Sequence, residues 1–508
     1  MVHPGSEGTA ASSTPVAVDD DAGSSLDRWH ARILWAIIAF VVLALWIRPI
    51  TSSLWIDELG TWWAVKDGAR EAIDRALEVH GQSPLYYLFA WAIRRVAGER
   101  EWALRLPSMA LTAGTAFMLY RAARRALDVE YARLVVLVFV AWPAVAFAAI
   151  DYRPYALALF LATAATLAFA MWLERGGALL GTGVAALAAL TIYTHYLYGA
   201  VLAVWIVYAV YRRTRGPLGV RWPSIAAAAI GLAILTAPLA AQVLQLWERR
   251  SEWTSGAAVS IDWLISAATP AAMISTAVVG GIAVLWMGGR LVAPPVDRSF
   301  VALSAAWFIV PIGGLCLISA VSAASVLHLR YAAVAAPAGA LLAGLAGRAV
   351  RPADARRVLA LVFAVSSILV LGGRHHSVDW RGSLAAAASQ VDEGSLTVVQ
   401  SGFTESDVEA WRRDPELRTF LLAPISRYPI TGPVAVLPKD LTLDATEAIV
   451  PEIEADIEAA DRVIFVGGEG TDSWLARVLG PGWEARRIPT ADEPVVTVFD
   501  RTTETDAP

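Results

Sequence analysis

The fold is decided by the stretch Leu134–Ile150, which reads LVVLVFVAWPAVAFAAI and contains no charged residue. Its length approaches the roughly 20 apolar residues that cross a bilayer as a helix. The runs Ile33–Ile47 and Ala156–Leu173 have the same character. Repeated runs of this kind predict a chain that crosses a membrane many times.

The composition of the whole chain supports this interpretation. Of its 508 residues, 57% are hydrophobic and only 17% are charged, whereas a soluble domain carries about 25% charged residues. The mean hydropathy is +0.53. These values exclude a disordered, fibrous or soluble nucleic-acid-binding protein. A net charge of −5 gives no reason to expect a polyanionic partner such as nucleic acid. The apolar runs instead predict contact with membrane lipid.

Eleven apolar runs are candidate membrane spans, and arginines between them set the orientation. The runs lie near residues 33–50, 105–120, 133–150, 154–173, 178–194, 196–211, 224–246, 271–289, 299–321, 330–348 and 356–372. Short connections rich in arginine follow the second, sixth and tenth runs, and such connections stay in the cytoplasm. This places the N-terminus in the cytoplasm and the C-terminal segment outside the cell membrane.

Three parts of the chain lie outside these runs. Residues 1–27 are mostly small and polar, which predicts a disordered cytoplasmic tail. The long first outer loop, 51–104, contains two amphipathic stretches, Glu71–His80 and Pro84–Gly98, which we expect to lie as helices on the outer membrane surface. Residues 28–372 then form the membrane domain and 373–508 a soluble one.

The segment 373–508 alternates short β-branched runs with helical patterns. The predicted strands are Leu396–Gln400, Val434–Leu437, Val463–Val466 and Val495–Phe499, and the predicted helices are Glu447–Ala460 and Asp472–Leu479. A turn containing Gly467, Gly468 and Gly470 lacks the full dinucleotide fingerprint, which favours an ordinary strand-to-helix turn over a phosphate loop. The fold class is therefore an all-α polytopic membrane protein with a C-terminal extracytoplasmic α/β domain.

Polar residues gather at the predicted outer ends of the spans. A charge at bilayer depth costs about 2.5–3.5 kcal/mol, so such residues are candidates for function. Five groups converge on the outer face: Asp57 and Glu58; His80 and Arg105; Asp151, Tyr152, Arg153 and Tyr155; His195 and Tyr196; and His328, Arg330 and Tyr331. A carboxylate can act on a hydroxyl as general base, and guanidinium groups bind phosphate oxygens. The set therefore suits a lipid phosphate attacked at the carbon beside the phosphate.

Each group also has a simpler interpretation. Asp57 and Glu58 could be solvated loop charges, and Asp151 with Arg153 could close a turn as an ion pair. His195 and His328 are more readily interfacial side chains than metal ligands, and Arg330 could extend its charge to the interface. Only the coincidence of acids and arginines on one face favours function.

Six short motifs, in order, resemble glycosyltransferase family 39, which includes protein O-mannosyltransferases and is close to the lipid A aminoarabinose transferases. They are Trp55-Ile56-Asp57-Glu58, the stretch from His80 to Tyr87, Ala103 to Ser108, Asp151-Tyr152-Arg153-Pro154-Tyr155, Tyr193-Thr194-His195-Tyr196, and Arg330-Tyr331. Asp379-Trp380-Arg381 extends the likeness to about residue 390. The sequence departs from the family where His80-Gly81-Gln82-Ser83-Pro84 stands in place of His-Pro-Pro, and where Asp151-Tyr152-Arg153 stands in place of Glu-Ala-Arg.

The resemblance implies a GT-C fold and a polyprenyl-phosphate-linked sugar donor, with inversion at the transferred carbon. It implies that Asp57 activates the acceptor hydroxyl, that Glu58 pairs with Arg105 to shape the loop, and that Arg153 and Arg330 bind the lipid phosphate. The predicted site comprises Asp57 and Glu58 as catalytic residues and, as substrate-binding residues, His80, Arg105, Asp151, Arg153, Tyr155, His195, Arg330 and Tyr331.

The predicted function is transfer of a sugar, with mannose one candidate, to a cell-envelope glycan, lipid or protein outside the membrane. A transporter or lipid flippase is the alternative, and a non-catalytic scaffold that presents the outer domain is a third. A flippase would place acids at the bilayer midplane within repeated halves, which this sequence does not display. No cofactor is required by the sequence; Asp57, Glu58 and His80 could hold a divalent cation or none.

Overall fold

The computed structural model of the chain describes residues 20–248, 258–269, 271–292, 295–322, 325–372, 375–403 and 413–502. Helix α1, Asp20–Val42, begins within the segment 1–27 that we expected to be disordered. The rest of that tail, 1–19, lies outside the described residues.

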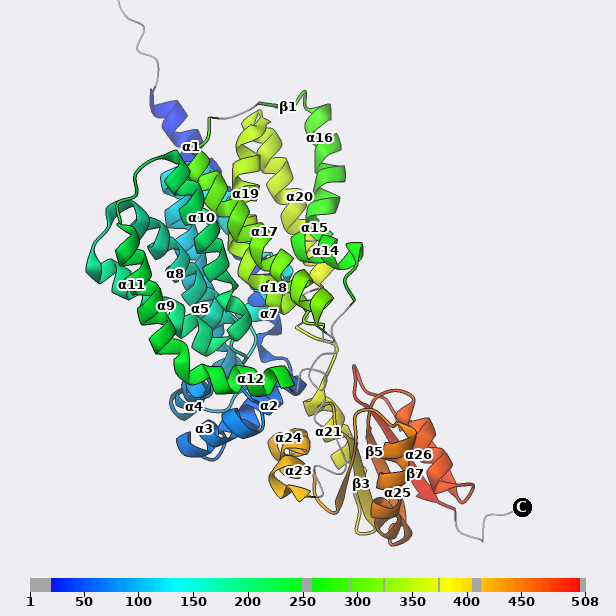
Figure 1. The fold of residues 1–508 in the computed structure, drawn as a ribbon. Helices are drawn as coiled ribbons and strands as arrows, with labels where there is room; N and C mark the ends of the chain where they lie inside the picture. The colour runs from blue at the N-terminus through cyan, green and yellow to red at the C-terminus, as the bar shows by residue number, and fades with distance from the viewer. Residues whose placement is uncertain are drawn as a thin grey trace, which may run out of the picture.

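A bundle of long helices forms the larger part of the molecule (Figure 1). Each of the eleven predicted apolar runs coincides with helical structure. The elements are α1 with η1 and η2 to Thr51, α5 (Glu101–Ala126), α6 (Val129–Val140) with α7 (Pro143–Ala149), α8 (Tyr155–Arg175), α9 (Ala178–Thr194), η3 (Tyr196–Ala200) with α10 (Val201–Arg215), α11 (Trp222–Thr236) with η4 and α12 (Ala240–Glu248), α14 (Ile261–Ala268), α15 (Ala271–Ser275) with η5 and α16 (Gly281–Trp286), α17 (Arg298–Val321), α18 (Leu329–Ala332) with η6 and α19 (Ala336–Ala349), and α20 (Ala353–Leu371).

Five described helices are long and apolar enough to cross a membrane, and two bent pairs raise that number to as many as seven. The five are Ala31–Thr51, Tyr155–Arg175, Trp222–Glu248, Arg298–Val321 and Leu329–Ala349. The pair α6–α7 bends by 72°, where Pro143 begins the second helix. The remaining predicted spans coincide with helices that are short, such as α9, or that carry several charges. The figure of eleven spans therefore stays a prediction.

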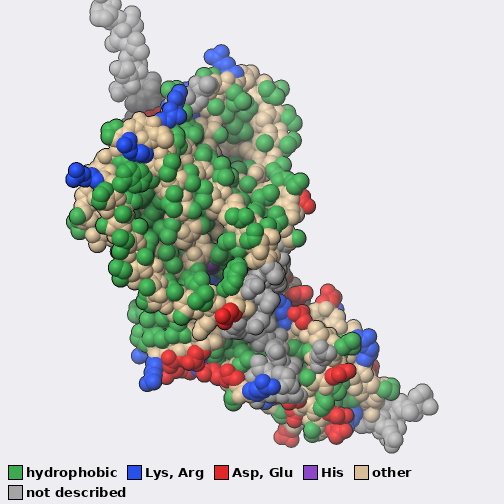
Figure 2. Space-filling view, in the orientation of Figure 1, with side chains coloured by type: hydrophobic (Ala, Val, Ile, Leu, Met, Phe, Trp, Pro, Cys, Tyr) green, Lys and Arg blue, Asp and Glu red, His purple; other side chains and the backbone are tan. Residues whose placement is uncertain are grey.

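Charged side chains divide between the two ends of the molecule. Figure 2 shows Lys and Arg gathered at the end of the bundle that carries β1, whereas Asp and Glu are concentrated around the opposite end. At the basic end the two-residue strands β1 (Arg290–Leu291) and β2 (Val350–Arg351) pair antiparallel. The belt between the ends is mainly apolar, as a membrane-embedded surface requires.

Three short helices lie at the acidic end and belong to the first loop: α2 (Ile56–Val65), α3 (Ala69–Glu78) and α4 (Pro84–Ala97). The two expected amphipathic helices coincide with α3 and α4. Helix α4 begins at Pro84, a residue suited to a first helical turn, and the Ser83 hydroxyl accepts a hydrogen bond from the Leu85 amide. The helix that carries Asp57, α2, was not expected from periodicity.

The C-terminal unit is a five-stranded sheet with helices. The strand order is β4-β3-β5-β7-β6, with β3 parallel to β4 and β5 and with β7 antiparallel to β5 and β6. The elements are α21 (Trp380–Ala388), β3 (Ser395–Gln400), α23 (Pro415–Leu421), α24 (Ala423–Arg427), β4 (Val434–Leu437), α25 (Leu443–Glu458), β5 (Arg462–Gly467), α26 (Thr471–Leu479), β6 (Trp483–Ile488) and β7 (Val495–Arg501). All six predicted elements are present. The missed strand, β6, is an edge strand whose residues are mostly exposed and half of them charged.

The glycine turn before α26 is an ordinary connection, as the sequence favours. The Asp472 carboxylate accepts hydrogen bonds from the Gly470 and Ser473 amides and lies 3.3 Å from the Thr497 hydroxyl. An acid in that position fills the place that a phosphate would need.

One hydrophobic core joins the first loop to the C-terminal unit. Phe420 of α23 lies between the Trp63 ring, 5.1 Å away, and the His80 ring, 5.3 Å away. Arg75 of α3 donates to Glu416 at 2.8 Å and to the Trp63 carbonyl at 2.8 Å. We propose a domain boundary near residue 372, because α20 ends at Leu371. The hydrophobic core nevertheless continues across this boundary.

Replacing Phe420 by leucine is expected to destabilise both sides of this shared core. The substitution removes ring contacts from a fully enclosed site and is expected to cost about 1–2 kcal/mol. Amide hydrogen exchange should accelerate in both α2 and α23. Leu443→Ala, at a position 83% exposed on α25, is the matched control and should change neither. Faster exchange in α23 alone would contradict a shared core.

Candidate active site

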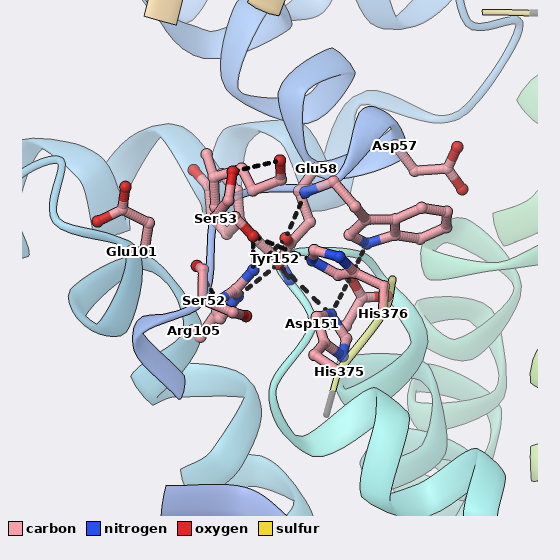
Figure 3. A network of polar contacts seen from close by, with 12 residues as sticks. Ser52, Ser53, Asp57, Glu58, Glu101, Arg105, Asp151, Tyr152, His375 and His376 are labelled. Carbon is pink, nitrogen blue, oxygen red and sulfur yellow. Dashed lines mark hydrogen bonds and ion pairs between the residues drawn. The ribbon is translucent and has the colours of Figure 1, made fainter. Parts of the chain in front are cut away.

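Helix α2 presents its two acidic residues in opposite directions because of how it begins. Trp55 is the residue before the helix, and its amide donates to Glu58 Oε2 at 3.2 Å. Glutamate three residues after a helix start commonly reaches back in this way. Asp57 is consequently directed away from Glu58, as Figure 3 shows.

Glu58 and Arg105 form an ion pair with no solvent exposure on either side chain. Arg105 Nε donates to Glu58 Oε1 at 2.8 Å, and Nη2 donates to Oε2. Glu58 Oε1 also accepts from the Tyr152 amide at 2.8 Å. The other Arg105 donors go to backbone carbonyls of residues 50, 52 and 53 and to the Ser52 hydroxyl. Glu58 and Arg105 thus hold the loop.

Both oxygens of Glu58 are engaged by Arg105 and by backbone amides, and neither side chain of the pair is exposed. Their pairing, which the family resemblance implied, is present. This burial favours a role in positioning the loop, and the catalytic role of Glu58 and the substrate-binding role of Arg105 stay predictions.

Asp57 forms a second ion pair, which is open to solvent. Its Oδ2 lies 2.7 Å from Arg330 Nη1, and each side chain is 25% exposed. The residues are 273 positions apart in sequence, so this contact joins the first loop to α18. The predicted base and the predicted phosphate ligand are therefore direct neighbours.

Aromatic rings surround the Arg330 guanidinium. Its central carbon lies 5.7 Å from the Trp55 ring, 5.9 Å from the Tyr155 ring and 5.5 Å from the Tyr331 ring. Cations within about 6 Å of an aromatic centroid are attracted to the ring face. Arg330 Nε has no hydrogen-bond partner among the described residues. The guanidinium is thus fixed in place while part of its donor set is unused.

His195 belongs to the same aromatic cluster. Its ring lies 5.4 Å from that of Tyr155 and 5.3 Å from that of Tyr331. Burial, together with the cations Arg153 and Arg330, lowers the pKa of His195 to about 3. The imidazole is therefore neutral at physiological pH and does not act as an acid there.

Arg153 and His80 flank α2 on its other sides. Arg153 Nη1 donates to the Thr61 hydroxyl at 3.1 Å and to the Asp57 carbonyl at 3.3 Å. His80 stacks on Tyr87 at 5.2 Å, and burial lowers its pKa to about 3. Arg153 thus anchors the helix that carries Asp57, whereas His80 packs against Phe420 of the C-terminal unit.

Asp151 is enclosed between the two ion pairs. Its Oδ1 accepts a hydrogen bond from Trp55 Nε1 at 3.0 Å, and its Oδ2 has no partner among the described residues. Burial raises the pKa of the Asp151 carboxyl to about 6, despite the hydrogen bond from Trp55. His375 Nε2 lies 3.6 Å from Asp151 Oδ1 (Figure 3). Asp151 therefore faces a histidine that the sequence did not single out.

The group Glu58, His375 and His376 could by distance hold a metal ion, since its ligand atoms lie within 4.8 Å of one another. Two of the three are already engaged. His376 Nε2 contacts the Ser53 carbonyl at 3.0 Å and His376 Nδ1 accepts from the Val378 amide at 3.2 Å. Glu58 is held by the Arg105 cation. The described donors therefore do not fit a metal, and nothing below depends on one.

A cavity of about 530 Å³ opens beside this site. Most of its wall is apolar, and the polar residues of the lining are Arg330, His328 and His375, the last with no exposed side-chain atom. The lining comprises Leu45, Pro143, Ala144, Ala146, Phe147, Ile150, His328, Leu329, Arg330, Leu371 and His375. The cavity thus has apolar walls formed by η1 (Leu43–Ile47), α7 and α20. The Arg330 guanidinium, which pairs with Asp57, lies at its edge.

The predicted site residues thus form two groups, with His80 beside them. Arg153, Tyr155, His195 and Tyr331 lie around the open Asp57–Arg330 pair, Glu58, Arg105 and Asp151 form the enclosed network, and His80 packs against Tyr87 and Phe420. Sequence reasoning missed Trp55, His375 and His376. The adjacent pair His375-His376, directly after the last apolar run of a chain with seven histidines, was the available signal.

Known proteins are similar to this chain in part of the sequence and in the overall fold. The sequence model of the family described as dolichyl-phosphate-mannose-protein mannosyltransferase matches residues 81–240. The crystal structure of ArnT from Cupriavidus metallidurans in the apo state is 14% identical with a TM-score of 0.53, over 92% of this chain and 98% of that chain. ArnT bound to undecaprenyl phosphate is 13% identical with a TM-score of 0.55, over 93% and 98%. None of the curated proteins matches this sequence.

Residues 81–240 are therefore similar in sequence to a mannosyltransferase family, and the fold of the chain is similar to that of the ArnT structures. Both comparisons agree with the resemblance that the motifs carry.

Proposed function

We propose that this protein transfers a sugar from a polyprenyl-phosphate donor to an acceptor hydroxyl outside the cytoplasmic membrane. The observation that carries the proposal is the Asp57–Arg330 pair at the edge of the apolar cavity. An isoprenoid chain suits the apolar walls, and a guanidinium suits the phosphate. The binding of undecaprenyl phosphate by ArnT, which has a similar fold, supports a donor of this kind.

In this mechanism Asp57 takes the proton of the acceptor hydroxyl as its oxygen bonds to the sugar carbon. The bond between that carbon and the phosphate oxygen breaks, and its electron pair stays on the departing polyprenyl phosphate. Arg330 stabilises the added charge. Because Nη1 holds Asp57 while Nε is unused, one guanidinium could keep the base and the phosphate in a fixed relation. Attack from the side opposite the phosphate would invert the carbon.

The site would lie at the outer surface of the cell membrane. The basic end of the molecule supports this orientation, because arginine-rich ends remain in the cytoplasm. The N-terminus would then be cytoplasmic, and the C-terminal sheet, beside the first loop, would be extracytoplasmic. A cell-envelope glycan, lipid or protein would be the acceptor, with mannose one candidate for the sugar.

The direct test is transfer of label from polyprenyl-phosphate mannose in membranes that contain the protein. We expect a labelled product that is absent from membranes without it. Glucose, galactose and arabinose donors would be tried in turn if mannose is not accepted. Failure with every donor would overturn the proposal and favour the transporter interpretation.

Arg330→Gln is expected to raise the donor KM by about 10- to 100-fold, because charge-assisted hydrogen bonds contribute about 1.5–3 kcal/mol. Initial rates across a range of donor concentrations would measure it. Arg348→Gln, in the last turn of α19 and bonded to the Pro295 carbonyl, is the matched control and should leave KM unchanged. An unchanged KM in the Arg330 variant would mean that Arg330 does not bind the donor phosphate.

A further inference from the structure

A second cavity, of about 470 Å³, lies between helices α8, α9, α10 and α11 and shares no residue with the cavity beside the active site. Every residue of its lining except Thr236 is apolar. Helix α11, which forms one wall, has no buried residue and therefore stands at the surface of the bundle. This cavity, which we call the α11 groove, is thus an apolar groove on the part of the molecule that the membrane surrounds.

One face of α10 leads from the α11 groove to an arginine. The groove residues of this helix are Leu202, Trp205, Ile206, Ala209 and Val210. They recur at intervals of three and four residues, which places them on a single face of the helix. Arg213 follows Val210 by three positions and Ala209 by four, so it lies at the end of that same face.

A second arginine stands where α11 begins. The first residue of α11 lines the groove, and Arg221 directly precedes it. The connection between the two arginines is held against the end of α8, because the Gly219 amide donates to the Leu173 carbonyl at 2.7 Å. Arg213 and Arg221 therefore lie at the same end of the α11 groove, on either side of a short, packed connection.

Both arginines can offer their charge to a ligand. Arg213 and Arg221 are exposed, and within the part of the chain that the structure describes neither forms an ion pair. Between residues 170 and 225, which include this end of the groove, the sequence has five arginines and one acidic residue, Glu174. The α11 groove is therefore apolar along its length and positively charged at one end.

We infer that the α11 groove binds an anionic phospholipid of the membrane, with one acyl chain along the groove and the phosphate group on Arg213 and Arg221. An acyl chain suits the apolar walls, and guanidinium groups bind phosphate oxygens. Basic sites between membrane helices bind anionic head groups in this way. A zwitterionic lipid has the same chains, but its positive group opposes the two arginines. The inference is independent of the proposed function.

The experiment compares the binding of phosphatidylglycerol and phosphatidylcholine, both with oleoyl chains, to the purified full-length protein by native mass spectrometry. We expect phosphatidylglycerol to bind about 25-fold more tightly, because each arginine near an anionic lipid contributes about fivefold. The double variant Arg213→Gln with Arg221→Gln should bind the two lipids alike. Equal binding of both lipids by the unaltered protein would overturn the inference.

Arg215 provides the matched control for the charge. It lies two positions beyond Arg213, with its guanidinium carbon 5.4 Å from the centroid of the Tyr211 ring, and Tyr211 does not line the groove. Arg213→Gln should lower the preference for phosphatidylglycerol about fivefold, whereas Arg215→Gln should leave it unchanged. The same loss in both variants would mean that the preference reports general charge and not a site.

A third variant tests whether the acyl chain occupies the groove. Ala229 is an exposed residue of α11 in the groove lining, so Ala229→Phe fills the groove without changing charge or core packing. This variant should weaken the binding of both lipids. Unchanged phosphatidylglycerol binding would show that the chain lies elsewhere. Tighter binding of undecaprenyl phosphate than of phosphatidylglycerol, lost in Ala229→Phe, would assign the groove to an isoprenoid lipid and overturn the inference.

Discussion

Asp57→Asn is expected to slow sugar transfer by about 10²- to 10⁴-fold, the range that a positioned general base contributes. The amide has nearly the same shape as the carboxylate but does not take up the acceptor proton. Its oxygen can still accept from Arg330, so the guanidinium is expected to stay near its present position. Binding of the donor lipid should therefore be nearly unchanged, and the loss should appear in kcat.

The measurement is single-turnover transfer of label from the accepted donor, with donor affinity determined separately. Asp74→Asn is the matched control, because Asp74 lies on α3 with 56% of its side chain exposed and should leave the rate unchanged. Transfer at the parent rate by the Asp57 variant would mean that another group activates the acceptor. It would also favour the scaffold interpretation if the C-terminal unit alone retained the biological activity.

Arg105→Met is expected to destabilise the protein by about 3–5 kcal/mol, the cost of removing one partner from a buried ion pair. The Glu58 carboxylate would remain enclosed without its cation, and three carbonyls of the loop entry would lose their donor. We expect the thermal half-life of the purified protein in detergent to fall sharply. The size-exclusion profile of heated samples would measure it. Transfer would be lost together with the fold of the loop.

The double variant Glu58→Gln with Arg105→Met distinguishes charge from packing. Neutralising both partners should recover part of the lost stability, because the buried charge disappears. Arg95→Met, on an exposed position of α4, is the control and should have little effect. A single Arg105 variant as stable as the parent would show that the ion pair does not hold the loop.

The sequence was sufficient to predict the helical bundle, because apolar runs report directly on helices in a bilayer. It also placed Asp57 and Arg330 on one face as candidates, because charges at span ends are costly, but it did not predict that the two side chains pair. It was not sufficient to separate Asp57 from its neighbour Glu58. Adjacent residues of a helix start point in different directions, and only the fold shows which one is enclosed.

The histidines at residues 375 and 376 were missed for a different reason. They follow the last apolar run, where the sequence changes character, and no motif marks them. Their importance depends on contacts with Asp151 and Ser53, which are distant in sequence. The edge strand β6 was missed because its exposed, charged residues give no hydrophobic alternation.

The core shared by the first loop and the C-terminal sheet has a consequence for biosynthesis. Trp63 and its partner Thr419 are separated by 356 residues, which a ribosome adds in roughly 20–70 s. During that interval the helices of the C-terminal unit that pack on α2 have not yet been made. The core around Trp63 would therefore be completed only by the last fifth of the nascent chain, long after the residues of the open ion pair.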